Sequence, residues 1–180
     1  MDIAGKTIAV VGNAQSLLAM RHGAAIDGHD VVLRMNRGLP EVPPAQGRRT
    51  DILAFATFQL VRDLHERFRA RRYVWMSPKG REDAAAAGLP AATEFYDLGR
   101  WQAVHDRLGA RPSVGAMVLD YLSALGPAAV TVFGFDFKRT RTFYRPDDFV
   151  GCHDYRAEEA FCTALARERG WRLVRDQAAA

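Results

Sequence analysis

Apolar residues along this chain fall into two patterns that alternate from one end to the other. The first pattern consists of short continuous apolar runs, which are typical of buried strands in a parallel sheet. They lie at residues 6–12, 30–35, 51–56, 73–76, 129–134 and 171–174. Segments with apolar residues at helical spacing predict helices at 16–25, 58–70, 82–87, 101–108, 112–126 and 154–169.

Two details complete this pattern. In the segment 58–70, Leu60, Val61, Leu64 and Phe68 lie at helical spacing, with charged residues on the opposite face. The segment 37–49 is rich in proline and glycine and is therefore expected to be a loop.

Strands that alternate with helices predict an α/β fold with a mostly parallel sheet and helices on both faces. A chain of 180 residues without an internal repeat or a linker indicates one Rossmann-like domain, which we place at residues 1–176. The Ala-rich end at 177–180 is expected to be a disordered tail.

Several features of the sequence indicate the cellular compartment in which the protein is expected. The start of the chain lacks the basic and apolar regions of a signal peptide, and no apolar run is long enough to cross a bilayer. Cys152 and Cys162, ten residues apart, do not have metal-ligand spacing and do not favour a structural disulfide. The expected compartment is the cytoplasm.

The net charge of +4 predicts that the protein attracts anions. Three explanations stay open: a solvated arginine-rich surface, a nucleic acid, and an anionic sugar nucleotide. The basic residues are not interleaved with a nucleic-acid-binding motif, which weakens the second.

The segment from Val10 to Ser16, VVGNAQS, is the first candidate site. A strand that ends in glycine and leads into a helix brings backbone N–H groups to the carboxyl edge of the sheet, where open α/β folds bind ligands. Gly12 would let the backbone approach a ligand, and Asn13 can donate and accept hydrogen bonds. The dinucleotide spacing G-x-G-x-x-G is missing, which weakens an NAD interpretation. A purely structural turn is the alternative.

A second candidate follows at the next strand. Arg34 and Asn36 alternate with apolar residues and share a strand face, and Asn36 lies at the carboxyl end, where a ligand contact is expected. The alternative is a surface polar pair at a strand end.

The third and fourth candidates are helix starts. Ser113 is a good N-cap, and the free N–H groups of Val114 and Gly115 could bind a phosphate or carboxylate; simple capping is the alternative. Asp154 is expected to cap the last helix, with His153 just before it. The helix dipole there favours a neutral imidazole that can accept a proton, although a surface histidine would look the same.

Read together and in this order, the segments resemble the sialyltransferase family of animals (glycosyltransferase family 29). Residues 9–36 resemble its long motif, residues 112–135, which include Gly134 and Phe135, its short motif, and His153 with Glu158 its H-x4-E motif. The chain looks like a short bacterial-type member.

The resemblance implies a GT-A-like variant of the Rossmann-like fold and an inverting transfer from a CMP-sugar to a glycan or glycolipid acceptor, without a metal ion or other cofactor. It also implies roles by position. Asn13 and Asn36 would contact the nucleotide, with Gly12 allowing close approach, and Gly134 and Phe135 would line the cytidine. Ser113, Val114 and Gly115 would bind ribose, phosphate or the sugar carboxylate, and His153 would be the catalytic base.

Several positions depart from the family pattern. Its two disulfide-forming cysteines are replaced by Ile8 and the Gly126–Pro127 region, which agrees with a reducing compartment. Ser-Thr-Gly of the short motif is Ser-Val-Gly here, and a phosphate-binding histidine is replaced within 142–145. We expect Tyr144 or Arg145 to donate to the phosphate instead.

Alternatives remain. A non-catalytic CMP-binding pseudoenzyme would bind the nucleotide without turnover, and a nucleic-acid-binding protein would show steeply salt-dependent binding to polynucleotides. The donor sugar could be sialic acid or Kdo. The acceptor, the linkage, the oligomeric state and a peripheral membrane contact stay open.

Overall fold

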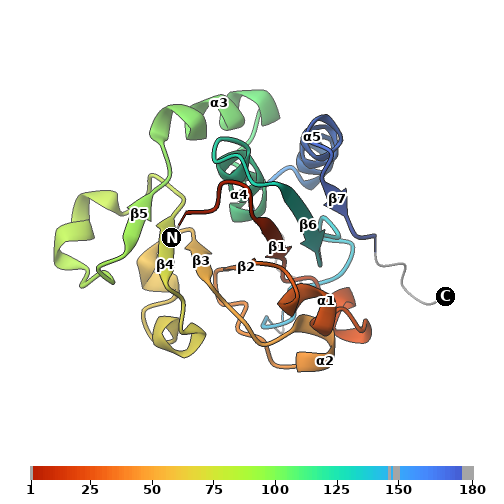
Figure 1. Ribbon diagram of the computed structural model, residues 1–180. Helices are drawn as coiled ribbons and strands as arrows, with labels where there is room; N and C mark the ends of the chain where they lie inside the picture. The colour runs from red at the N-terminus through yellow and green to blue at the C-terminus, as the bar shows by residue number, and fades with distance from the viewer. Residues whose placement is uncertain (1, 146, 148–150, 176–180) are drawn as a thin grey trace.

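A computed structural model describes residues 2–145, 147 and 151–175 of the chain. Seven parallel strands form one sheet in the order β5-β4-β3-β2-β1-β6-β7 (Figure 1). The strands are β1 Thr7–Val11, β2 Val31–Met35, β3 Ile52–Phe55, β4 Arg72–Trp75, β5 Thr93–Phe95, β6 Ala129–Phe133 and β7 Arg172–Leu173. The predicted α/β class and parallel sheet are thus confirmed.

Helices cover both faces of the sheet. In Figure 1, α3, α4 and α5 lie on one side and α1 and α2 on the other. The α-helices are α1 Gly23–Asp27, α2 Pro43–Gln46, α3 Leu98–Leu108, α4 Val114–Ser123 and α5 Tyr155–Glu168. Short 3-10 helices complete the fold: η1 Gln15–Ala19, η2 Phe58–Leu60, η3 His65–Phe68 and η4 Arg81–Ala86.

Alternation along the strands divides the core between the two faces. In β1, Ile8 and Val10 belong to the large apolar cluster under α3–α5, whereas Ala9 and Val11 belong to the cluster on the opposite face. Successive side chains of a strand point to opposite faces, so a continuous apolar run is what a strand covered on both sides requires.

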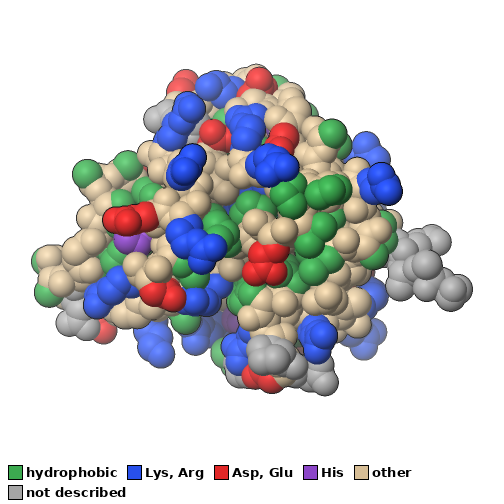
Figure 2. All heavy atoms as spheres, turned by 90° about the horizontal axis from the view of Figure 1, so that it is seen from below, with side chains coloured by type: hydrophobic (Ala, Val, Ile, Leu, Met, Phe, Trp, Pro, Cys, Tyr) green, Lys and Arg blue, Asp and Glu red, His purple; other side chains and the backbone are tan. Residues whose placement is uncertain are grey.

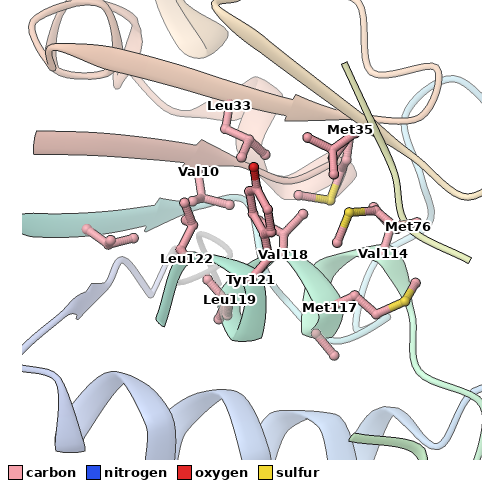
Figure 3. Packing of buried hydrophobic residues seen from close by; sticks show 14 of the residues in the cluster. Val10, Leu33, Met35, Met76, Val114, Met117, Val118, Leu119, Tyr121 and Leu122 are labelled. Atoms are coloured by element: carbon pink, nitrogen blue, oxygen red, sulfur yellow. The ribbon is translucent and has the colours of Figure 1, made fainter. Parts of the chain in front are cut away.

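Helix α4 is the central element of the large cluster. Figure 3 shows its Tyr121 and Leu122 directed toward Val10 and Leu33 of the sheet. Leu119, fully buried, lies on the side of α4 toward α5. Because apolar residues surround it on the sheet side and on the helix side, α4 is buried over most of its circumference and holds the site described below in place.

The order of the strands reverses beside β1. The chain moves outward from β1 to β5 and then crosses back to place β6 on the other side of β1, with Val11 paired to Phe133. The loops that follow β1 and β6 therefore leave the sheet in different directions. In open α/β sheets such a reversal opens a crevice at the carboxyl edge.

Two predicted helices are wrong. The segment 16–25 is divided between η1 and α1, because its start is paired to a distant loop: Ala14 bridges Thr142, and the N–H of Gln15 donates to the carbonyl of Arg141. The segment 58–70 contains η2 and η3 instead, with Arg69 in a left-handed conformation at φ 52°. Its buried Phe58, Val61 and Leu64 are three residues apart, which fits 3-10 turns, and its Leu60 is 45% exposed.

Smaller differences occur elsewhere. The helix expected at 82–87 is the 3-10 helix η4, while those expected at 101–108, 112–126 and 154–169 correspond to α3, α4 and α5. Two elements were not predicted: α2, which lies inside the Pro-rich segment read as a loop, and the three-residue edge strand β5.

The two cysteines are free, Cys152 exposed and Cys162 buried in α5. No helix in the described part of the chain is long and apolar enough to cross a membrane. The tail predicted at 177–180 lies outside the described residues.

Candidate functional site

A cleft of about 770 Å³ opens at the carboxyl edge of the sheet, where the strand order reverses. Its walls come from the loops after β1, β2 and β6, from the start of α4 and from the segment before α5. All ten residues predicted for the site line this one cleft: Gly12, Asn13, Asn36, Ser113, Val114, Gly115, Gly134, Phe135, Tyr144 and His153.

Gly12 and Gly134 form the floor where the two loops meet. The N–H of Gly12 donates to the carbonyl of Phe133 over 2.8 Å. A Cβ atom at Gly12 would lie 2.4 Å from the carbonyl oxygen of Gly134, a contact that no side chain can make. Gly134 has φ 67°, a conformation that favours glycine. The glycine at position 12 is therefore required by the packing of the two loops, which is a different reason from the one inferred from the sequence.

The amide of Asn13 holds three parts of the site together. Its Nδ2 donates to the carbonyl of Met35 over 3.1 Å, and its backbone carbonyl accepts from the N–H of Phe143. Its side chain also hydrogen-bonds with Tyr144. Burial raises the pKa of the Tyr144 phenol, so this group is a hydrogen-bond donor at neutral pH.

Asn36 lies just past the end of β2 in a left-handed conformation, φ 51°. Its Oδ1 accepts from the N–H of Ala56 over 3.0 Å, so the donor group at Nδ2 takes no part in this hydrogen bond. Arg34, which shares its strand with Asn36, does not reach the cleft. It is 1% exposed and lies under the α1–α2 face, so the expected surface pair at the strand end is wrong for Arg34.

The loop after β6 is fixed to the loop after β1 by Asp136, a residue that the sequence did not single out. Its Oδ2 accepts from the N–H of Thr140 over 2.8 Å, from the Thr140 hydroxyl and from the hydroxyl of Ser16. Its Oδ1 accepts from the N–H of Lys138, and both Phe137 and Lys138 have positive φ. The carboxylate therefore sets the course of the loop that carries Tyr144.

Ser113 caps α4, as predicted, with its Oγ accepting from the N–H of Ala116. It has a second partner that was not predicted. Glu158 of α5 accepts from the Ser113 N–H and from the Ser113 hydroxyl, each over 2.6 Å. The hydroxyl proton of Ser113 is thus directed to Glu158 and not into the cleft. The glutamate of the H-x4-E motif, 3% exposed, joins the starts of α4 and α5.

Burial raises the pKa of the Glu158 carboxyl, and the two hydrogen bonds from Ser113 act against this shift.

The start of α4 offers a ligand few polar side-chain atoms, because Val114 is apolar and buried in the core. Gly115 lies under Phe135, whose ring would be 3.0 Å from a Cβ atom at this position. What α4 offers a ligand is therefore its first N–H groups, which have no acceptor within the helix.

His153 is partly buried just before α5, and Asp154 caps that helix, as predicted, by accepting from the N–H of Ala157. The Nδ1 atom of His153 lies 2.8 Å from the carbonyl oxygen of Arg111. A carbonyl only accepts, so Nδ1 carries the proton and Nε2 of the neutral ring carries the lone pair. This is the tautomer that a general base requires.

The surroundings of the cleft are basic. Among the described residues, two carboxylates line it, those of Asp136 and Glu158, and both are occupied by the hydrogen bonds described above. Arg145, one of the two residues expected to replace the missing histidine, is exposed to 41% at its side chain and pairs with Asp147. The basic side chains that line the cleft are Arg37, Lys79, Arg111, Lys138, Arg141 and Arg145.

The face covered by α1 and α2 carries charges of both signs (Figure 2). Figure 2 shows the face covered by α1 and α2, where Lys and Arg side chains are scattered among acidic and hydrophobic ones. Among the described residues, no group of three or more His, Cys, Asp or Glu side chains lies close enough together to hold a metal ion.

Part of the sequence and the fold of nearly the whole chain are similar to those of sialyltransferases. Residues 4–79 match the family model of glycosyltransferase family 29 (sialyltransferase), which confirms the predicted resemblance for this part of the chain. No curated protein matches the sequence significantly.

Solved sialyltransferases share the fold over nearly the whole chain. A mammalian sialyltransferase in complex with Gal-β-1-3GalNAc-ortho-nitrophenol matches with a TM-score of 0.69 and 22% identity, covering 96% of this chain and 70% of that chain. The monofunctional α-2,3-sialyltransferase Cst-I from Campylobacter jejuni gives 0.72 and 13%, covering 99% and 79%. CstII from the same organism, in complex with cytidine-5'-monophosphate, gives 0.65 and 14%, covering 94% and 79%.

Proposed function

We propose that the protein is an inverting, metal-independent glycosyltransferase that transfers sialic acid or a related nonulosonic acid, such as Kdo, from a CMP-sugar to a hydroxyl group of a glycan or glycolipid. The observation that carries this proposal is the convergence of all ten predicted site residues on one basic cleft, with His153 in the base tautomer. The crystallised relatives that bind CMP and a galactoside support the choice of substrates.

In this proposal the donor lies across the floor of the cleft. Asn13 and Asn36 contact the nucleotide, and Gly134 and Phe135 line the cytidine. Because the Ser113 hydroxyl donates to Glu158, the contact with phosphate or sugar carboxylate falls to the backbone N–H groups of Val114 and Gly115.

The chemical step needs one base and a stabilised leaving group. Nε2 of His153 takes the proton of the acceptor hydroxyl while the oxygen of that hydroxyl forms a bond to the anomeric carbon of the donor sugar. The bond from that carbon to the phosphate oxygen breaks on the opposite face, which inverts the configuration. Charge that develops on the phosphate of CMP is stabilised by the N–H groups of α4 and by the phenol of Tyr144.

A CMP-binding pseudoenzyme is the second candidate. It is favoured by the engagement of Ser113 with Glu158, which removes a hydroxyl from the cleft, and by Tyr144 in place of a histidine. Both candidates bind CMP, and turnover of a CMP-sugar separates them.

The first experiment measures thermal stabilisation by CMP, UMP, GMP, AMP and NAD. A ligand that binds only the folded state and is present at about 100 times its Kd adds about 2.7 kcal/mol of stability. Selective stabilisation by CMP supports the proposal, and consumption of CMP-sialic acid is then compared with that of CMP-Kdo. Equal or absent stabilisation by all five nucleotides contradicts it.

A further inference from the structure

A second pocket of about 510 Å³ adjoins the cleft. It lies between the segment after β2, the helix η3 and the loop after β6. The two hollows share Arg37, Arg141, Tyr144 and Arg145 as lining residues, so they are neighbours across the loop that carries Tyr144. The other lining residues of the second pocket are Leu39, Glu41, Leu64, Arg67 and Phe143.

The charge of this pocket is unbalanced. Among the described residues, four guanidinium groups and the carboxylate of Glu41 line it. Two of the four guanidinium groups are neutralised by carboxylates that do not line the pocket, those of Asp63 and Asp147. Arg37 is held by Asp63, with two N–O distances of 2.7 and 2.8 Å, and Arg145 by Asp147 in the same two-pronged way. These ion pairs fix two of the guanidinium groups at the wall of the pocket. The exposed Arg67 has no acidic partner among the described residues, so its charge is not neutralised within this part of the chain.

The rest of the lining suits a sugar ring. Leu39, Leu64 and Phe143 give apolar surface, and the rings of Phe143 and Tyr144 meet edge to face at 5.3 Å. Aromatic and aliphatic surface covers the C–H faces of a ring, while a guanidinium group that is not held by a carboxylate, such as that of Arg67, binds an anionic substituent in a two-pronged manner. Such a combination discriminates an acidic saccharide from a neutral one.

Resting on the function proposed above, we infer that this pocket binds the anionic group of an acidic acceptor glycan, a phosphate or a carboxylate on a sugar ring, while the reacting hydroxyl of that glycan lies in the larger cleft. Because Tyr144 lines both the cleft and the second pocket, a saccharide bound beside this residue would extend from one into the other. Arg67 is the binding residue that distinguishes the second pocket, because it does not line the donor cleft.

The test compares two acceptors with CMP-sialic acid as donor: Gal-β-1-3GalNAc-nitrophenol and the same disaccharide with a phosphate on one ring. Three proteins are used: the wild type, Arg67→Ala, and Arg71→Ala as a control that removes an equally exposed arginine lining neither hollow. The wild type is expected to prefer the phosphorylated acceptor in kcat/KM. Arg67→Ala is expected to reduce that preference about tenfold or more, with the neutral acceptor changed less than about twofold. Arg71→Ala keeps the wild-type preference.

Three kinetic results overturn the inference: an equal loss for both acceptors, an equal loss in both variants, or an increased KM for the donor in Arg67→Ala, which would assign the pocket to CMP-sugar binding. A polynucleotide that binds with steep salt dependence and competes with the phosphorylated acceptor also overturns it.

Consumption of CMP-sialic acid and of CMP-Kdo in the presence of both acceptors separates this inference from the proposed function. If the wild type consumes neither donor, the proposed function fails, and the pocket is tested alone by ligand-observed NMR with galactose 6-phosphate and galactose. Binding of the phosphate that is weakened in Arg67→Ala supports the pocket, and equal binding of both sugars contradicts it.

Discussion

The two faces of the sheet are covered in different ways. Over one face, α3, α4 and α5 are regular helices of 10 to 14 residues, and α4 presents fully buried residues such as Val118, Leu119 and Leu122. Over the other, α1 has five residues and α2 four, and an arginine, Arg34, takes a fully buried position in β2.

Buried polar side chains add to the apolar clusters on this second face. The guanidinium of Arg34 donates to the carbonyls of Arg49 and Gln46 and to the hydroxyl of Thr50. The carboxylate of Asp27 accepts from the N–H groups of Arg48 and Arg49. Burial lowers the pKa of Arg34 to about 10, so the group stays charged at neutral pH. The comparison teaches that apolar clusters lie on both faces, but that long amphipathic helices cover one, while short helices on the other are held in addition by bonds from side chains to the backbone.

The largest effect is expected on the apolar face. Leu119→Ala deletes a fully buried side chain from the cluster under α4, and the remaining cavity should lower the free energy of unfolding by about 2–5 kcal/mol. Denaturant unfolding followed by circular dichroism measures it. A loss below about 1 kcal/mol would show that Leu119 is packed less tightly than its complete burial indicates.

Arg34→Met tests the polar face. The substitution leaves the carbonyls of Gln46 and Arg49 without their donor, and we expect a loss of about 3 kcal/mol in the free energy of unfolding. Arg34→Lys should not restore it, since one ammonium cannot serve three acceptors in the planar guanidinium geometry. Exposed Arg48→Met, the matched control, should stay within about 0.5 kcal/mol. An equally stable Arg34→Met protein would remove the contrast between the faces.

Gly12→Ala tests the place where the loops of the cleft meet. The added methyl group would lie 2.4 Å from the Gly134 carbonyl oxygen, so the loops must separate, at a cost of about 1–3 kcal/mol of stability and with weaker CMP binding. Gly28→Ala, whose added methyl group would meet its nearest atom at 3.3 Å, is the control and should leave both quantities near the wild-type values. Equal effects of the two substitutions would contradict the account of this glycine.

Glu158→Gln gives the smallest and most pH-dependent effect. Because burial raises the pKa of Glu158 above its ordinary value, its contribution to stability is complete below about pH 4.5 and is lost as the pH rises through the raised pKa. Glutamine has no such loss. The stability of the variant relative to the wild type should therefore increase between about pH 4 and about pH 7. The opposite trend would mean that the hydrogen bonds from Ser113 outweigh burial.

The same contrast explains what could be predicted from the sequence. Six apolar runs predicted six of the seven strands, and the position of Gly12 after the first run predicted its place at the carboxyl edge of the sheet, where it lines the cleft. The capping roles of Ser113 and Asp154 followed from their local chemistry.

What could not be predicted depends on pairs that are distant in sequence. Asp136 binds Ser16 across 120 residues, and Glu158 binds Ser113 across 45. The segment 58–70 has the same apolar residues in either helical form, and its 3-10 turns are set by packing on the sheet. Local patterns carry no signal for such contacts.

The most direct test of the central claim is the release of CMP from CMP-sialic acid by the wild type and by His153→Asn. The amide nitrogen of asparagine can still donate to the Arg111 carbonyl, as Nδ1 does now, but the base is absent. The account predicts unchanged affinity for CMP and turnover reduced about 10²- to 10⁴-fold. Turnover equal to that of the wild type, or no binding of CMP to either protein, would contradict it.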